Sequence, residues 1–192
     1  IDVISMGVDF SYFNPKYRDE NWAVEEGLES PVFLFVGRIA EKKGLRYLIE
    51  AFSMEEIQQR KCSLLIVGDG PLKKELELYA KQTDVAGKIR FLGDVNHDGL
   101  KNIYASADVL CVPSIVAKNG DSEGLGLVLL EAAASGIPSI ASDSGGISDI
   151  VKHNKTGFLV EQKNVQQLVD ACIKYMDSSV LIKEHGLAAR EF

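Results

Sequence analysis

The chain has 192 residues, of which 46% are apolar and 26% charged, a composition typical of a globular domain with a full hydrophobic core. The formal net charge of −7 disfavours nucleic acid or an anionic membrane surface as a partner, and no apolar run reaches the roughly eighteen residues of a membrane-spanning helix. Cys62, Cys111 and Cys172 are far apart in apolar runs, which indicates buried free thiols in a reducing compartment rather than a disulfide or metal set.

Short apolar runs alternate with helical patterns after a polar, turn-prone stretch at the start of the chain. The runs that predict buried strands are 32–36, 62–67, 89–92, 109–112, 139–141 and 157–160. The helical patterns lie at 45–52, 72–79, 98–106, 127–134 and 165–176. This alternation predicts an α/β fold, a three-layer Rossmann-like domain in which a parallel sheet of about six strands has helices on both faces.

We expect three parts along the chain. Residues 1–30 form a lead-in segment, 31–180 form the Rossmann-like domain, and 181–192 begin a C-terminal helix that is cut in mid-course. Because the chain starts at Ile1 and ends within a helical pattern, we interpret it as an excised domain whose active site is completed by a missing N-terminal part.

Ligands of parallel α/β sheets bind beyond the carboxyl ends of the strands, so the loops that follow the strands are the candidate site. Every such loop contains glycine: 37–44, 68–71, 93–96, 118–124 and 142–146. Arg38 and Lys43 in the first loop are the candidate phosphate clamp, although both are equally compatible with solvated surface charges that pair with Glu41. The Rossmann dinucleotide fingerprint fails at Lys73, and no Gly-Lys-Ser/Thr phosphate loop occurs.

Residues 123–131, Glu-Gly-Leu-Gly-Leu-Val-Leu-Leu-Glu, join the loop after the fourth strand to a helix. The glycines allow the turn into the helix, and the backbone N–H groups at its start attract phosphate. Glu131 lies inside the helix, where it could accept hydrogen bonds from a diol such as a ribose. The alternative is that Glu123 and Glu131 are ordinary surface charges, which holds for most isolated pairs of glutamates.

The motifs together resemble the C-terminal, donor-binding domain of the retaining glycosyltransferases of group 1, or family 4, which have the GT-B fold. The resemblance covers nearly the whole chain. It rests on Gly-Val-Asp at 7–9 with Phe13 and Pro15, Phe-Val-Gly-Arg at 35–38 with Lys43 and Gly44, Val-Gly-Asp-Gly-Pro at 67–71, Phe-Leu-Gly at 91–93, Ala-Asp-Val at 107–109 with Pro113 and Ser114, the pair Glu123 and Glu131, Gly-Ile-Pro at 136–138, Gly-Gly at 145–146, and Thr-Gly-Phe-Leu-Val at 156–160. Three positions depart from the usual family pattern: Leu125, Asp149 and Met6.

The resemblance implies a nucleotide-sugar site in residues 31–180. Catalytic roles fall to Arg38, Lys43 and Glu123, with the two cations holding the donor diphosphate and stabilising the leaving nucleotide. Glu131 would accept from the ribose hydroxyls, and backbone groups near Val95 would meet the base. The full binding set implied is Gly37, Arg38, Lys43, Val95, Glu123, Gly124, Leu125, Gly126, Leu127, Val128 and Glu131.

The implied function is the donor half of a nucleotide-sugar-dependent hexosyltransferase, with a UDP- or GDP-linked sugar as substrate and no metal or other cofactor. Residues 119–125 resemble bacterial exopolysaccharide and capsule enzymes, which implies cell-surface polysaccharide or glycoconjugate biosynthesis in the cytoplasm, at the inner face of the membrane through the missing acceptor domain. The isolated domain is expected to bind nucleotides without transferring sugar. The alternatives are a non-catalytic nucleotide-binding or regulatory module and a receiver-like interaction domain. The receiver is disfavoured because Arg38 stands where it needs acidic residues.

Overall fold

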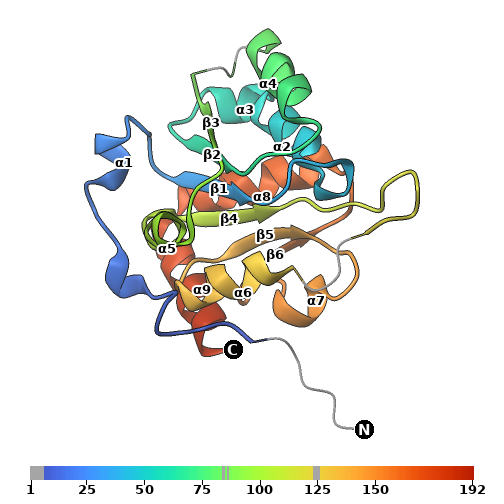
Figure 1. Cartoon of the computed structure of the whole chain (residues 1–192). Helices are drawn as coiled ribbons and strands as arrows, with labels where there is room; N and C mark the ends of the chain where they lie inside the picture. Colours follow the sequence, from blue (N-terminus) through green and yellow to red (C-terminus); the bar gives the residue numbers. More distant parts are fainter. Residues whose placement is uncertain (1–6, 84, 86, 123–125) are drawn as a thin grey trace, which may run out of the picture.

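The computed structural model describes residues 7–83, 85, 87–122 and 126–192. In this part of the chain, six strands form one sheet in which every neighbouring pair is parallel (Figure 1). The strands are β1 (Val32–Val36), β2 (Ser63–Val67), β3 (Ile89–Gly93), β4 (Val109–Val112), β5 (Ser139–Ser142) and β6 (Gly157–Val160). Their order is β3-β2-β1-β4-β5-β6, which confirms the predicted Rossmann-like α/β fold.

The helices connect these strands as predicted, with short additions. They are α1 (Trp22–Glu25), α2 (Leu45–Phe52), α3 (Glu55–Gln58), α4 (Lys73–Gln82), α5 (His97–Ser106), α6 (Leu127–Ala134), α7 (Ile147–Ile150), α8 (Val165–Asp177) and α9 (Ser179–Glu191), with 3₁₀ turns η1 (Pro15–Tyr17) and η2 (Glu41–Lys43). Helices α1, α3 and α7 were not predicted, because a four-residue helix is too short to show a helical period. Helix α9 begins two residues before the expected position, since the Ser178 side chain accepts a hydrogen bond from Leu181 N and caps it.

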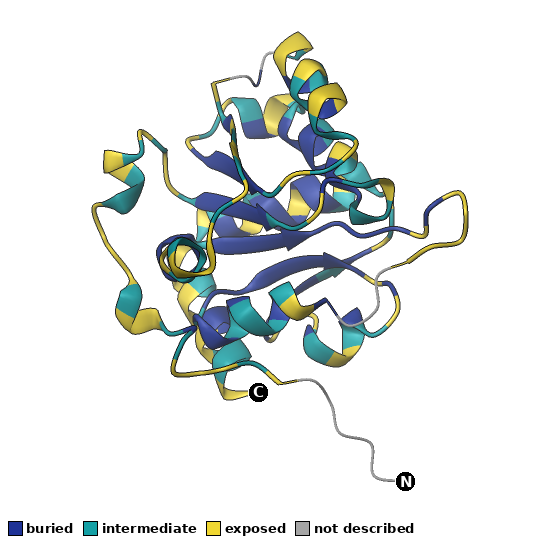
Figure 2. Cartoon of the chain, in the orientation of Figure 1, coloured by how far each residue is buried: buried dark blue, intermediate teal, exposed yellow. Residues whose placement is uncertain are grey.

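Two separate cores lie on the two faces of the sheet. Because side chains alternate along a strand, Phe33 and Phe35 of β1 pack in the core beneath α2, α3, α4 and α8. Val32 and Leu34 enter the core beneath α5, α6 and α7. The inner strands β1, β2, β4 and β5 are accordingly buried on both faces (Figure 2), which makes three layers and explains why their sequences are continuous apolar runs. The edge strand β3 is partly exposed, at Arg90 and Leu92.

The lead-in segment is packed onto the second of these cores. Phe13 is only 4% exposed and meets the Tyr104 ring of α5 edge-on, with ring centroids 5.6 Å apart. Arg18 forms an ion pair with Asp108 at the start of β4, with a distance of 3.0 Å. The other Asp108 oxygen accepts from Val32 N of β1. The lead-in is thereby fastened to the amino ends of β1 and β4.

Candidate functional site

The order of the strands reverses between β1 and β4, since β2 and β3 extend the sheet on one side and β5 and β6 on the other. Such a switch point opens a crevice at the carboxyl ends of the two strands. The loops that leave β1 and β4 are fastened together there: Ile115 N donates to Lys42 O at 2.8 Å, and Lys42 Nζ pairs with Asp121 at 3.1 Å. This links the first predicted site loop to the stretch that leads toward α6 (Figure 1).

The two residues predicted to bind phosphate, Arg38 and Lys43, lie in the loop after β1, at this switch point. A β-carbon at Gly37 would lie 3.8 Å from Lys43 Nζ, so the ammonium group lies against the glycine that ends β1. Arg38 is exposed, and its guanidinium has no hydrogen bond or ion pair within the described residues. Lys43 thus lies against Gly37, and Arg38 is the next residue along the chain, so two cationic side chains occur at the carboxyl end of β1, a pattern suited to a phosphate or diphosphate.

The base-binding prediction falls in the same place. A cavity of about 280 Å³ is lined by Gly37, Arg38 and Val95, together with residues of the loop after β2. A second cavity of about 320 Å³ lies on the other side of Arg38 and reaches Lys42 and Asp121. The structure thus brings together three predicted ligand residues from the ends of two different strands, β1 and β3.

The loop after β2 contributes a neutralised carboxylate to the first cavity. Asp69 Oδ2 accepts from Lys73 Nζ at 2.8 Å, and Asp69 Oδ1 accepts from Gly70 N. These hydrogen bonds, that from Lys73 most of all, hold the pKa of Asp69 below its usual value. Lys73, which breaks the dinucleotide fingerprint, therefore serves to balance the charge of Asp69 beside a site proposed for anions.

Helix α6 carries the remaining predicted residues. It begins after Gly126, whose φ of 65° lies in the left-handed region, and its first residues, Leu127 and Val128, are exposed and half-buried. Glu131 lies inside this helix, as predicted, and is half-buried. The predicted residues Glu123, Gly124 and Leu125 lie outside the described residues.

The partner of Glu131 was not predicted from the sequence. Tyr104 of α5 is fully buried, and its hydroxyl donates to Glu131 Oε2 at 2.8 Å. Burial, the Glu131 charge and this hydrogen bond raise the pKa of Tyr104 well above its usual value, so that it stays a donor. Tyr104 lies in a helical pattern of apolar residues, and nothing in that pattern identifies Glu131 as the partner of its hydroxyl.

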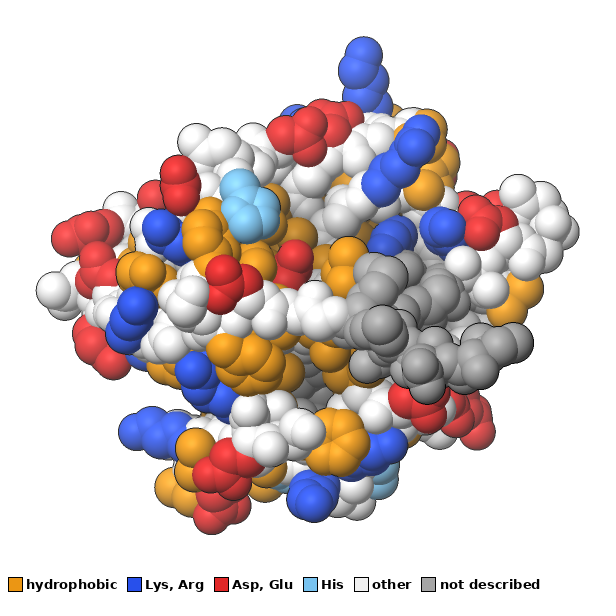
Figure 3. Space-filling view, turned by 60° about the horizontal axis from the view of Figure 1, so that its bottom comes forward, with side chains coloured by type: hydrophobic (Ala, Val, Ile, Leu, Met, Phe, Trp, Pro, Cys, Tyr) orange, Lys and Arg blue, Asp and Glu red, His pale blue; other side chains and the backbone are white. Residues whose placement is uncertain are grey.

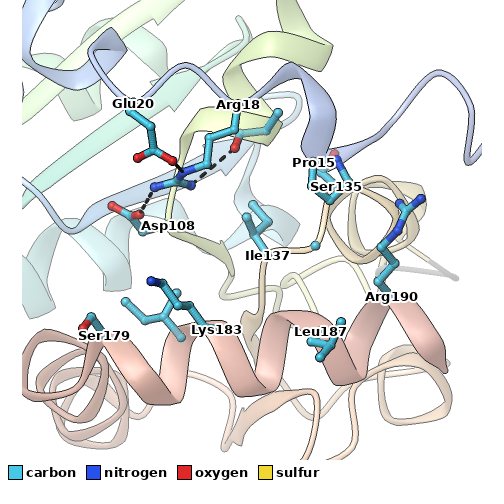
Figure 4. Close-up of a pocket in the computed structure, with 13 residues that line it drawn as sticks. Pro15, Arg18, Glu20, Asp108, Ser135, Ile137, Ser179, Lys183, Leu187 and Arg190 are labelled. Atoms are coloured by element: carbon cyan, nitrogen blue, oxygen red, sulfur yellow. Dashed lines mark hydrogen bonds and ion pairs between the residues drawn. The ribbon is translucent and has the colours of Figure 1, made fainter.

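A larger cavity of about 480 Å³ opens at the opposite end of the sheet, between the lead-in segment and α9. Figure 4 shows Lys183, Leu187 and Arg190 of α9 along one side, with Arg18 and Asp108 opposite. The Arg18 guanidinium already has partners within the protein, since it pairs with Asp108 and Glu20 and donates to two backbone carbonyls. None of the predicted site residues lines this cavity, so its size is not a guide to the ligand.

Figure 3 shows basic, acidic and hydrophobic side chains interspersed on one face, without a continuous basic surface. Cys62, Cys111 and Cys172 are buried free thiols, as predicted. Across the described ranges, no group of three or more His, Cys, Asp and Glu is arranged to hold a metal ion, and none of the helices is long and apolar enough to cross a membrane.

Comparison with known proteins gives the family. Residues 17–191 match the family model described as glycosyl transferases group 1. The chain belongs to the group 1 glycosyltransferases. This confirms the resemblance drawn from the motifs. A receiver domain, the alternative disfavoured above, has the strand order 2-1-3-4-5, which differs from the order β3-β2-β1-β4-β5-β6 of this chain.

Two relatives show how much of a group 1 glycosyltransferase is present. The chain is 36% identical over 165 residues to a GDP-mannose-dependent α-(1-6)-phosphatidylinositol monomannoside mannosyltransferase of Mycobacterium tuberculosis, covering 85% of this chain and 43% of that protein. It is 31% identical over 191 residues to the amylovoran biosynthesis glycosyltransferase AmsK of Erwinia amylovora, covering 99% and 45%. The chain therefore spans about half the length of the curated relatives it matches.

Solved structures identify which half of the GT-B fold the chain represents. The C-terminal domain of a group 1 family protein (LpcC) from Francisella tularensis superposes with a TM-score of 0.84 at 26% identity, covering 96% of this chain and 95% of that one. Anabaena Alr3699/HepE, in complex with UDP, has the same fold with a TM-score of 0.84 at 22% identity, covering 99% of this chain and 51% of that one. The glycosyltransferase chain is thus a C-terminal, Rossmann-like domain of the GT-B type.

Proposed function

We propose that this chain is the donor-binding half of a retaining glycosyltransferase, which transfers a hexose from a UDP- or GDP-linked sugar to an acceptor. One observation carries the proposal: Gly37, Arg38 and Val95 line a single cavity at the carboxyl ends of the strands, with Lys43 folded against Gly37. Support for the nucleotide comes from the UDP bound by HepE and from the GDP-mannose dependence of the mycobacterial relative.

In this mechanism the chain stabilises the leaving nucleoside diphosphate. Negative charge develops on the diphosphate as its bond to the sugar breaks, and Arg38 and Lys43 would bind it. The backbone N–H groups at the start of α6 would add positive potential. Because two cations and a helix terminus supply this charge, we propose that no metal or other cofactor takes part. Glu123 is assigned to the transferred sugar, together with Gly124 and Leu125.

The acceptor is proposed to bind on an N-terminal domain, across a cleft from the strand ends, so that the isolated chain binds donor but does not transfer sugar. Cell-surface polysaccharide or glycoconjugate biosynthesis in a bacterial cytoplasm, at the inner face of the membrane, is the proposed setting, and AmsK supports it. Sugar transfer to an added acceptor by the isolated chain would overturn the division of labour. A non-catalytic nucleotide module would show no transfer even in a protein that also contains the acceptor domain.

Calorimetric titration of the 192-residue chain with UDP, GDP and ADP, each with and without common sugars, tests the donor role. The Francisella match is itself an isolated C-terminal domain, which supports using the chain by itself. Saturable binding of one nucleotide is expected, and Glu131→Ala should weaken it by about 1.5–3 kcal/mol, the scale of hydrogen bonds to a charged group. Absence of binding by all three nucleotides would contradict the proposal, and an unchanged dissociation constant in Glu131→Ala would remove Glu131 from the ribose role.

A further inference from the structure

The Tyr104 hydroxyl holds one end of the Glu131 carboxylate. The distance from Tyr104 Oη to Glu131 Oε2 is 2.8 Å, and within the described residues neither side chain has another hydrogen-bond partner. The tyrosine is 0% exposed, whereas Glu131 is half-buried at the surface of α6. Tyr104 therefore uses one lone pair of one carboxylate oxygen from inside the protein, and the second lone pair of that oxygen and the whole of the other oxygen are left for a ligand.

The tyrosine cannot easily turn away from this contact. Its ring lies in the core beneath α5 and α6, and the buried Phe13 ring packs edge-on against it, at 88° between the planes. A buried phenol without an acceptor would lose the hydration of its hydroxyl at a cost of about 1–3 kcal/mol, so the Glu131 carboxylate is its required partner. The direction of the hydrogen bond is also set, because an ionised carboxylate can only accept.

A vicinal diol needs a carboxylate prepared in this way. Each of its two hydroxyls can donate a hydrogen bond, and one ionised carboxylate that faces the diol can accept both of them. A Glu side chain on a helix otherwise rotates about three bonds, and fixing it on binding would cost on the order of 1 kcal/mol. Holding the carboxylate beforehand removes that cost from the binding of the diol.

We propose that Tyr104 is a positioning residue, which orients the Glu131 carboxylate so that it accepts from both ribose hydroxyls of the nucleoside diphosphate. This inference rests on the proposed function, because it assumes that the nucleotide lies beside α6. Beyond that function, it assigns selectivity for ribonucleotides over deoxyribonucleotides to Tyr104 of α5 and Glu131 of α6 acting together. Tyr104 acts only through Glu131 and has no part in catalysis.

The test compares UDP with 2′,3′-dideoxy-UDP, and GDP with its dideoxy analogue, in calorimetric titrations of the chain. The wild type should bind the preferred ribonucleotide at least about tenfold more tightly than its dideoxy form, which corresponds to one hydrogen bond to a charged group. Tyr104→Phe should lower the affinity for the ribonucleotide about three- to tenfold and leave the dideoxy form within about twofold.

Three comparison variants separate positioning from a structural role. Tyr175→Phe makes the same chemical change on α8, beneath the other face, where the hydroxyl lies 2.9 Å from His185 Nδ1, and it should leave the affinity ratio unchanged. Glu131→Gln should abolish the ribose preference without disturbing the Tyr104 ring, which provides a second route if Tyr104→Phe fails to fold. Adding Tyr104→Phe to Glu131→Gln should then cause no further loss.

Each possible result decides the matter. Equal losses for ribonucleotide and dideoxynucleotide in Tyr104→Phe would make the contact a structural tie between α5 and α6 and overturn the inference. So would an unchanged ribose preference in Tyr104→Phe, or one that persists in Glu131→Gln. If the wild type binds neither UDP nor GDP, the proposed function fails. If the wild type binds but the variants leave the ratio of ribonucleotide to dideoxynucleotide affinity unchanged, only the role of Tyr104 and Glu131 fails.

Discussion

Gly44 and Pro113 meet where the loops after β1 and β4 cross, so closely that a β-carbon at Gly44 would lie 1.9 Å from the Pro113 carbonyl oxygen. Gly44 also has a φ of 63°, in the left-handed region that favours glycine. The family motif that contains Gly44 is therefore explained by backbone contact at the switch point. The same contact holds Lys43 next to the end of β4.

Gly44→Ala should destabilise the chain by about 3–5 kcal/mol, because left-handed strain and a clash between a methyl group and a backbone carbonyl add together. Gly120→Ala is the matched control, since Gly120 has a φ of 83° but no atom within 4 Å of the position of a β-carbon. It should show only the strain, about 1–2 kcal/mol. Urea denaturation followed by circular dichroism measures both, and equal losses would contradict the role of the Pro113 contact.

Arg38→Ala should weaken the binding of UDP about tenfold and that of UMP less than about threefold, because a guanidinium that contacts the distal phosphate loses that contact only with the diphosphate. Arg60→Ala, which removes the same charge near the amino end of β2, is the control and should change neither affinity. Calorimetric titration gives both constants. Equal losses for UMP and UDP would exclude a clamp on the distal phosphate.

Asp108→Ala should lower the free energy of unfolding by about 2–3 kcal/mol. It removes the acceptor of the buried Val32 N–H, at 2.8 Å, and leaves Arg18, whose side chain is 36% exposed, without one of its two carboxylate partners. Nucleotide affinity should be unchanged, since Asp108 lies at the amino end of β4. Glu20→Ala, in the same ion-pair group but 80% exposed, should cost less than about 0.5 kcal/mol. If Asp108→Ala lowers the free energy of unfolding as little as Glu20→Ala does, Asp108 does not fasten the lead-in segment.

His185 should make the chain less stable in mild acid. Burial, more than the neighbouring charges, lowers the pKa of His185 below its usual 6.5, and the side chain is 6% exposed beside the Tyr175 hydroxyl. The unfolded chain therefore binds more protons than the folded chain around pH 6, so stability falls as the pH decreases through 6.5. Asp9, Asp69 and Asp98, whose pKa values are lowered from 3.8, act only at lower pH.

Urea denaturation at pH 7.5 and pH 5.5 measures this difference. His185→Gln should show a smaller loss of stability between the two pH values than the wild type does, whereas His97→Gln, at an exposed position, should keep the wild-type loss. An equal loss in His185→Gln and the wild type would exclude His185 as its source.

The sequence by itself predicted the long elements in their order along the chain, with bounds that differ from those of the structure by three residues at most. It could do so because a core on both faces of a parallel sheet requires apolar runs, and helices against it require a helical period. Helix α6 begins and ends where it was predicted, at Leu127 and Ala134. The helical pattern placed Glu131 inside it, and the rule that ligand loops lie at the carboxyl ends of strands predicted that the loops containing Gly37, Arg38 and Val95 would converge.

Only the tertiary structure decided which distant residues touch. Tyr104 and Glu131 are 27 positions apart, and Arg18 and Asp108 are 90 apart. No periodicity joins them, because a period describes one element, whereas these hydrogen bonds depend on how two elements pack against the sheet. The lead-in segment is the clearest case: its sequence predicted a polar approach to the domain, and packing placed Phe13 in the core, against the tyrosine that holds Glu131.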